Sequence, residues 1–212
     1  MNRFSRFLAS VLAVLAINTA PATLLKVDSV EAQTNEGLQI KGVTVSGSGC
    51  PQGTAEGVLS GDTLSVTFSD FRAVASKPRL DNKSCNLRIA IQVPSGYNLQ
   101  PILVQYLGFA DIPRGGAGSL RSIATLGAGR IGSGILSFSS GFSNNFSYYF
   151  PLVAESINGC RAPKVTTLGL NTSLTARATN IPDNQLTQVV LDTVDIQTQS
   201  PVLQIKFRYL PC

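Results

Sequence analysis

The chain has 212 residues, a formal net charge of +5 and only 14% charged residues, and its polar positions are filled mainly by Ser, Thr, Gly and Asn. This composition favours strands and turns over long soluble helices, which depend on Glu, Lys and Arg. Histidine is absent, which removes the commonest general base and the commonest zinc ligand. Because the Lys and Arg residues are scattered, we expect no nucleic-acid partner, and we expect no metal and no cofactor.

The first 32 residues have the pattern of a signal peptide. Arg3 and Arg6 precede an uncharged, largely apolar run of ten residues, 8–17. A helix of that length, about 15 Å, is too short to cross a bilayer core of about 30 Å. Small residues allow cleavage before Thr23 or before Gln33, and we favour the second. An uncleaved interfacial anchor is the alternative.

Removal of this leader predicts a secreted protein, extracellular or, in a host with an outer membrane, periplasmic or attached to the cell surface. We expect no transmembrane segment in the mature chain. We assign residues 33–41 to a flexible tail and residues 42–212 to a single β-domain, and we expect a monomer.

Four cysteines follow the leader: Cys50, Cys85, Cys160 and Cys212. An even number in an exported chain predicts disulfides. No Cys-x-x-Cys spacing and no histidine support a zinc site instead. Three pairings are possible, and we favour Cys50–Cys85 with Cys160–Cys212, one bridge in each half. The second bridge involves the last residue of the chain, so it would stop the final strand from fraying.

Apolar and polar residues alternate with a period of two in several segments, most clearly in 64–69, 87–93, 168–177 and 203–209. Such alternation is typical of strands with one face in a core and one in water. No helical stripe is found in the mature part, and turn residues separate the segments. The pattern predicts an all-β fold, an antiparallel β-sandwich of Greek-key or jelly-roll-like type. Further strands are expected at 38–46, 102–110, 120–126, 135–139, 146–155 and 189–198.

The run Gly47-Ser-Gly-Cys-Pro-Gln-Gly-Thr54 and the strand Leu64-Ser-Val-Thr-Phe-Ser-Asp-Phe71 resemble an uncharacterised family of small secreted, cysteine-containing β-proteins of fungi and bacteria, domain of unknown function 4360. Weaker resemblances follow at 85–96, at 106–111 and at 160–174, so that the similarity extends over about 42–212. It implies secretion, a β-rich domain and four paired cysteines, and it supplies no catalytic residue.

Aromatic and amide side chains gather between residues 142 and 150. Aromatic faces can stack on sugar rings while amides bond to hydroxyls. In a strand, Phe146, Tyr148 and Phe150 share one face, expected in the core, and Tyr149 points outward. Core packing is the favoured role of this aromatic segment, and a ligand platform is the alternative. Our candidate ligand-binding residues are Phe142, Asn144, Asn145, Tyr149 and, from the glycine-rich segment 114–118, Arg114.

Two further patterns concern catalysis and nucleotide binding. Carboxylate catalysis needs two acids about 5–10 Å apart, and Asp70 and Asp111 are the first pair to examine for a shared cleft. Most other acids fall in turns or at strand ends, so we select no catalytic residue. The segment 127–132 matches Gly-x-Gly-x-x-Gly, but no helix is expected after it, so it predicts a glycine-rich hairpin or crossover loop.

Together these features predict a secreted, non-catalytic binding or structural module. Its expected ligand is a cell-wall or extracellular polysaccharide or a surface protein. The alternative is a carboxylate-dependent hydrolase or lyase that acts on extracellular polysaccharide.

Overall fold

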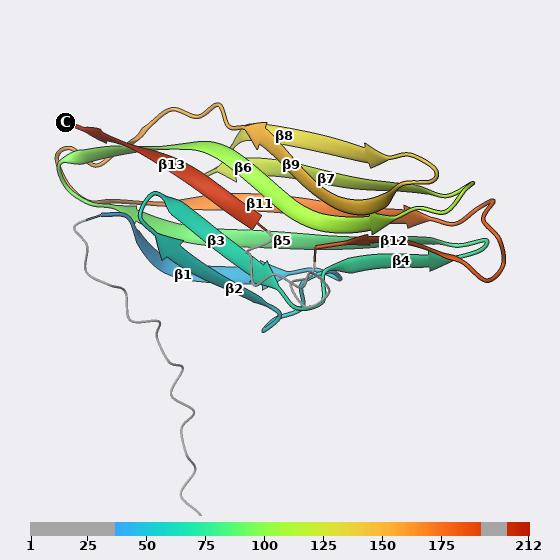
Figure 1. The fold of residues 1–212 in the computed structure, drawn as a ribbon. Coiled ribbons are helices and arrows are strands. Elements are labelled where there is room, and N and C mark those ends of the chain that lie inside the picture. The colour runs from blue at the N-terminus through green and yellow to red at the C-terminus, as the bar shows by residue number, and fades with distance from the viewer. Residues whose placement is uncertain (1–36, 192–202) are drawn as a thin grey trace, which may run out of the picture. The chain divides into compact units, whose positions relative to one another are not determined.

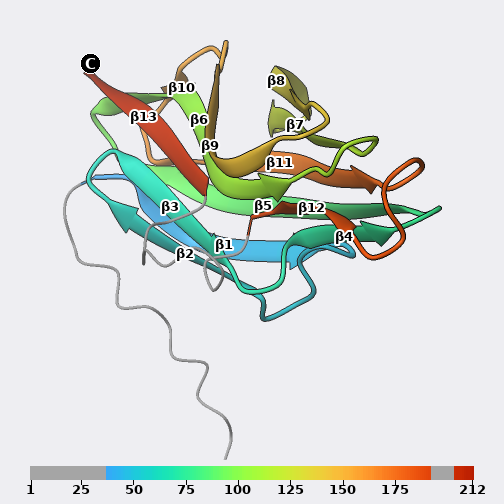
Figure 2. The same ribbon diagram turned by 45° about the vertical axis from the view of Figure 1, so that its right-hand side comes forward.

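The structure of the protein, a computed structural model, describes residues 37–191 and 203–212. These residues form two antiparallel β-sheets arranged as a sandwich (Figures 1 and 2). The predicted all-β sandwich with two disulfides is therefore confirmed. The predicted signal peptide, the predicted tail up to residue 36 and the part of the expected strand 189–198 beyond residue 191 lie outside the described residues.

One sheet has five strands. Its central pair, β5 and β11, runs antiparallel in unbroken register over 14 residues, from Lys164 opposite Val93 to Arg177 opposite Leu80. In spatial order the strands are β1 (Gln39–Ser46), β5 (Leu80–Val93), β11 (Lys164–Arg177), β7 (Ala117–Leu126) and β8 (Gly129–Phe138).

The other sheet has eight strands and is organised around the 15-residue strand β6. One edge of β6 pairs with β13 and then with β12, and the other edge pairs with β10 and β9. The main path is β2 (Ala55–Ser60), β3 (Thr63–Phe68), β13 (Leu203–Pro211), β6 (Tyr97–Asp111), β12 (Leu186–Val190) and β4 (Arg72–Ser76), with β9 (Ser143–Pro151) and β10 (Ile157–Asn158) beside it.

The alternating segments of the sequence correspond to observed strands, and the exceptions have a physical explanation. The short strands β2, β4 and β10 were missed because two to six residues carry little periodic signal. The strand expected over 38–46 is β1, which begins within the stretch assigned to the tail. The segment 127–132 is the turn and first residues of the β7–β8 hairpin, where Gly127 has a φ of 57°, so the hairpin interpretation of this motif is confirmed.

The core lies between the sheets and consists of the inward-facing residues of both. From β5 and β11 come Ile89, Ile91 and Leu168, and from the opposite sheet Val104 and Ile205, all fully buried. Because successive side chains in a strand point to opposite faces, burial of these residues forces their neighbours outward into solvent.

Three hydroxyl groups cross this apolar core and link the sheets. The Tyr106 hydroxyl of β6 lies 2.8 Å from Ser122 Oγ of β7 and 2.6 Å from Thr172 Oγ1 of β11, which are themselves 3.3 Å apart. All three residues are buried. Burial raises the pKa of Tyr106 to about 12, and the hydrogen bonds to Ser122 and Thr172 oppose that rise in part.

One disulfide joins a loop to a strand and the other joins a loop to the last residue of the chain, and the favoured pairing is confirmed. Cys50, in the loop after β1, bonds to Cys85 of β5, with Cα atoms 5.2 Å apart. Cys160 bonds to Cys212 with Cα atoms 5.7 Å apart, and the Cys212 amide also donates to Gly96 O. The chain approaches Cys50 through Gly47, which has a φ of 132° and where a Cβ would come within 2.2 Å of Ser84 O. Only glycine fits there.

We predict that Tyr106→Phe lowers the free energy of unfolding by about 1–2 kcal/mol, because Ser122 and Thr172 lose a buried partner. The folded-state pKa of Tyr106 is raised, so its stabilising effect is complete below about pH 10 and is lost as the pH rises towards 12. Urea unfolding at several alkaline pH values should show wild-type stability falling more steeply than that of Tyr106→Phe.

The matched control for this prediction is Tyr148→Phe. Tyr148 is half-buried, and its hydroxyl has no hydrogen-bond partner among the described residues. Its replacement should be close to neutral. Equal losses in the two variants, or parallel pH profiles of wild type and Tyr106→Phe, would contradict a role for the hydroxyl cluster.

We also predict that the double replacement of Cys160 and Cys212 by serine costs about 4 kcal/mol, since the bridge closes a loop with a sequence separation of 52 residues. Chemical unfolding of the oxidised wild type and the variant measures this difference. A loss below about 1 kcal/mol would show that β13 is held by its strand pairing alone.

Candidate functional site

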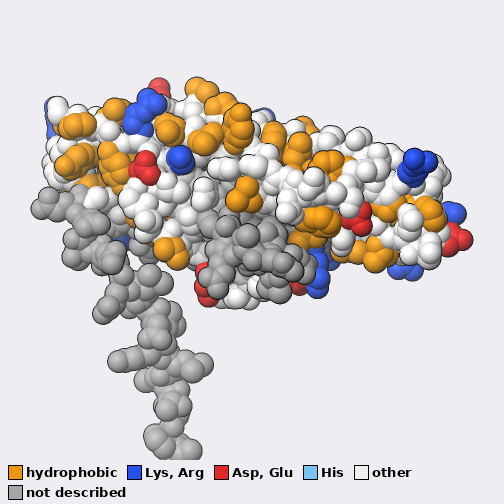
Figure 3. Space-filling view, in the orientation of Figure 1, with side chains coloured by type: hydrophobic (Ala, Val, Ile, Leu, Met, Phe, Trp, Pro, Cys, Tyr) orange, Lys and Arg blue, Asp and Glu red, His pale blue; other side chains and the backbone are white. Residues whose placement is uncertain are grey.

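The outward face of β6 and β9 forms a continuous strip of side chains on two paired strands. Gln105 lies opposite Tyr149, Leu107 opposite Ser147, and Phe109 opposite Asn145. Figure 3 shows the molecule from the side on which β6 and β9 lie in Figure 1, with few charged side chains over these strands. The paired outward positions of the strip, from Leu103 and Pro151 to Asp111 and Ser143, include one charged residue, Asp111.

Tyr149 is the most prominent side chain of this strip. The predicted alternation holds: Phe150 is buried, Phe146 and Tyr148 pack partly buried against the core, and Tyr149 is 67% exposed. Beside it, Gln105 Nε2 donates a hydrogen bond of 3.0 Å to Ser147 Oγ. This bond orients the amide on the same face as the tyrosine ring.

Gln105 was not among the predicted site residues. The alternation in 102–110 places it outward, but only the pairing of β6 with β9 brings it beside Tyr149. That pairing joins segments about 40 residues apart, and no local pattern in the sequence indicates it.

Phe142 has a different environment from Tyr149. It is half-buried, and its ring lies 5.3 Å from that of Phe138, the last residue of β8. Phe138 in turn contacts Phe146, with ring centroids 4.8 Å apart. Phe142 therefore belongs to an aromatic cluster at the edge of the core.

Arg114 and Asn144 lie at one end of β9. The turn that carries Arg114 is bonded to the turn before β9: Ile112 N donates to Phe142 O, and Gly141 N donates to Ile112 O, both at 2.7 Å. Arg114 and Asn144 are exposed. Tyr149 lies five residues further along β9, about 17 Å away. The candidate residues therefore spread along the strand instead of converging on one pocket.

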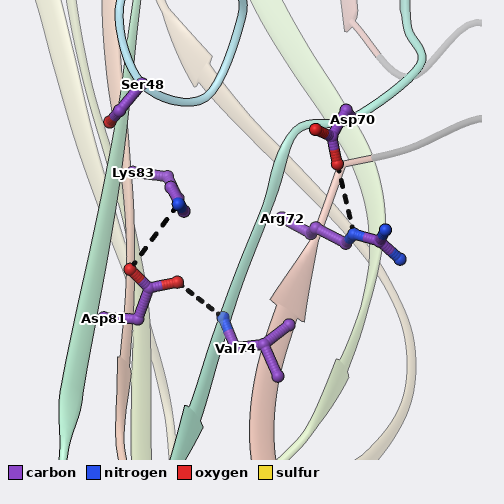
Figure 4. A pocket seen from close by; sticks show the side chains of 6 residues that line it. All are labelled: Ser48, Asp70, Arg72, Val74, Asp81 and Lys83. Carbon is purple, nitrogen blue, oxygen red and sulfur yellow. Dashed lines mark hydrogen bonds and ion pairs between the residues drawn. The ribbon is translucent and has the colours of Figure 1, made fainter.

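A shallow cavity of about 200 Å³ lies between β4 and β5 and contains two carboxylates (Figure 4). Asp70 accepts from Arg72 Nε at 3.2 Å. Asp81 lies 3.9 Å from Lys83 Nζ, and its Oδ2 accepts from the Val74 amide at 2.9 Å. Each carboxylate is thus bonded to its own basic partner. The full lining is Ser48, Asp70, Arg72, Val74, Asp81 and Lys83.

Asp111 does not line the cavity that contains Asp70. It is the last residue of β6, opposite Ser143 of β9 and Gln188 of β12. The carboxylate that lines this cavity together with Asp70 is that of Asp81, which sequence spacing did not suggest. These two acids, eleven residues apart in the sequence, line one cavity because β4 and β5 are neighbours.

The described residues contain neither a metal-binding group of side chains nor a membrane-spanning helix. In 37–191 and 203–212, no three His, Cys, Asp or Glu side chains form a group that could hold a metal ion. The same part of the chain contains no helix of the length and hydrophobicity needed to cross a membrane.

Comparison with known proteins identifies the family. Residues 36–212 match the family model described as "Domain of unknown function (DUF4360)". The chain belongs to this family. An uncharacterised secreted protein of Arthroderma benhamiae is 33% identical over 91 residues, 41% of this chain and 37% of the relative, so the match spans little more than a third of that protein. The resemblance read from the cysteine motif is confirmed.

Proposed function

We propose that the protein is a secreted, non-catalytic module that binds polysaccharide through the outward strip of β6 and β9. The observation that carries the proposal is the 67% exposure of Tyr149 on a paired strand, beside the amide of Gln105. A large aromatic ring that remains in water, flanked by hydrogen-bonding groups, is suited to a ligand with both an apolar face and hydroxyls. Pyranose rings have this character.

The shape and charge of the strip favour an uncharged polymer over a small molecule. Asn145 and Tyr149 are four residues apart on one face of β9, about 13 Å. Ser147 lies between them, and Gln105 lies opposite Tyr149. The surface is open, whereas small-molecule sites are usually concave. Asn144 lies opposite Ala110, on the other face of β9 from Tyr149, and is exposed at the end of the strand near Arg114, while Phe142 supports that end from the core.

Secretion is supported by the leader pattern, by the two disulfides and by the name of the relative as a secreted protein. Disulfides persist in oxidising compartments outside the cytosol. Within this proposal the module acts as a monomer at the cell surface or in the surrounding medium, without cofactor. The carboxylates of the β4–β5 cavity are held in ion pairs, so no observation favours the alternative hydrolase or lyase.

We predict that Tyr149→Ala reduces retention on the bound polysaccharide about tenfold, because the stacking ring contributes roughly 1.4 kcal/mol. The measurement is pull-down of the oxidised mature protein by insoluble cellulose, chitin, β-glucan and mannan. The melting temperature should remain that of the wild type, since the side chain is mostly exposed.

Ile135→Ala provides the matched control. Ile135 is 61% exposed but lies on β8, in the five-stranded sheet. Its replacement removes a similar exposed apolar surface and should leave retention unchanged. Failure of the wild type to bind any of the four polymers, or equal binding by Tyr149→Ala, would overturn the proposal.

A further inference from the structure

The five-stranded sheet has a strong excess of basic residues. Its strands contain seven Lys and Arg residues and one acid, Asp81. Asp81 lies opposite the buried Ala176 and pairs with Lys83, two residues before the buried Cys85. Asp81 and Lys83 therefore lie on the inward side of β5. The outward-pointing positions of the sheet carry arginines and no acid: Arg88, Arg121, Arg130 and Arg177.

Two of these arginines lie in one row across the sheet. Arg88 of β5, Gly169 of β11, Thr125 of β7 and Arg130 of β8 are in register. With neighbouring strands about 4.8 Å apart, the two arginine Cα atoms are separated by about 14 Å. Gly169, in the middle of the row, has no side chain, and its neighbours fill the space above it. A Cβ at Gly169 would come within 2.5 Å of Thr125 Oγ1 and 3.7 Å of Arg88 Nη1. The Arg88 guanidinium thus extends over the glycine towards Arg130.

Among the described residues, no acidic side chain neutralises the positive charges on this face. Within 37–191 and 203–212, Arg88, Arg121 and Arg177 form no ion pair, and Arg130 donates only to the neutral Ser133 hydroxyl. Amide and hydroxyl side chains, among them Asn86, lie between them. The face combines free guanidinium groups with neutral hydrogen-bonding groups. We call it the arginine face and define it by Arg88, Arg121, Arg130 and Arg177.

We propose that the arginine face binds an acidic polysaccharide whose sugar units carry carboxylates. A guanidinium can donate two parallel hydrogen bonds to a carboxylate, and the intervening amides and hydroxyls match sugar hydroxyls. The Cα atoms of Arg88 and Arg130 are separated by more than the screening length of about 8 Å in physiological salt. A small anion would therefore meet one arginine at a time, whereas a polymer engages several and gains from their linkage.

The composition of the face favours a polyuronate over single-stranded nucleic acid or a lipid surface. The outward positions of its strands carry no Phe, Tyr or Trp on which bases could stack. Its large exposed apolar residues are Leu80, Ile135 and Val165. Leu80 and Val165 lie at opposite ends of the β5–β11 ladder and Ile135 lies on β8, so the three form no continuous patch. This site is distinct from the strip of β6 and β9, so the inference does not depend on the proposed function.

Affinity electrophoresis of the oxidised mature protein tests the proposal. Native gels contain polygalacturonate, neutral dextran or single-stranded DNA. We expect retardation by polygalacturonate only, with loss of retardation in roughly 0.5 M salt. Arg88→Glu combined with Arg130→Glu should weaken binding at least tenfold. Melting temperature and circular dichroism verify folding, and the Arg→Gln pair replaces the Glu pair if the latter is unfolded.

The matched control is Lys206→Glu combined with Arg208→Glu, an equal change of charge at two exposed positions of β13 in the other sheet. This control and Tyr149→Ala should retain polygalacturonate binding. Absence of retardation of the wild type, equal loss in both charge-reversed pairs, or preference for DNA would each overturn the proposal. Because Tyr149→Ala affects only the strip of β6 and β9, failure of one proposal leaves the other testable.

Discussion

The organisation of the molecule depends on the antiparallel ladder between β5 and β11. Fourteen consecutive pairs without a bulge fix which side chains of both strands face the core. A shift of one residue would exchange the two faces, placing Arg88 in the core and Ile89 in water. The arginine face is therefore a direct consequence of the same register that builds the apolar core.

The candidate surfaces lie on paired strands, and the two sheets are linked across the core. The hydroxyl cluster of Tyr106, Ser122 and Thr172 joins β6 to β7 and β11, and the Cys160–Cys212 bridge holds the end of β13. β6, which contains Tyr106, also supplies Gln105 on its opposite face. A strand held on its inner side presents its outer side chains with little freedom, which suits a binding surface better than a mobile loop.

The sequence predicted features that depend on local pattern, and missed those that depend on distant pairing. Alternation around Phe150 was enough to place Tyr149 outward, and cysteine positions were enough for the favoured bridges. The position of Gln105 beside Tyr149 depends on the register between β6 and β9. Asp70 and Asp81 line one cavity only because β4 contacts β5. The arginine face could not be predicted from the sequence, because its four arginines are scattered along the chain and share one face only when four strands align in the sheet.

The most direct test of this account is native-state hydrogen exchange of the oxidised protein, followed residue by residue by NMR. If the β5–β11 ladder is the structural centre, its paired amides should exchange only through global unfolding, with opening free energies equal to that from chemical denaturation. The exposed turn that contains Arg114 should exchange far faster. Amides of β5 and β11 that exchange as readily as this turn would contradict the account.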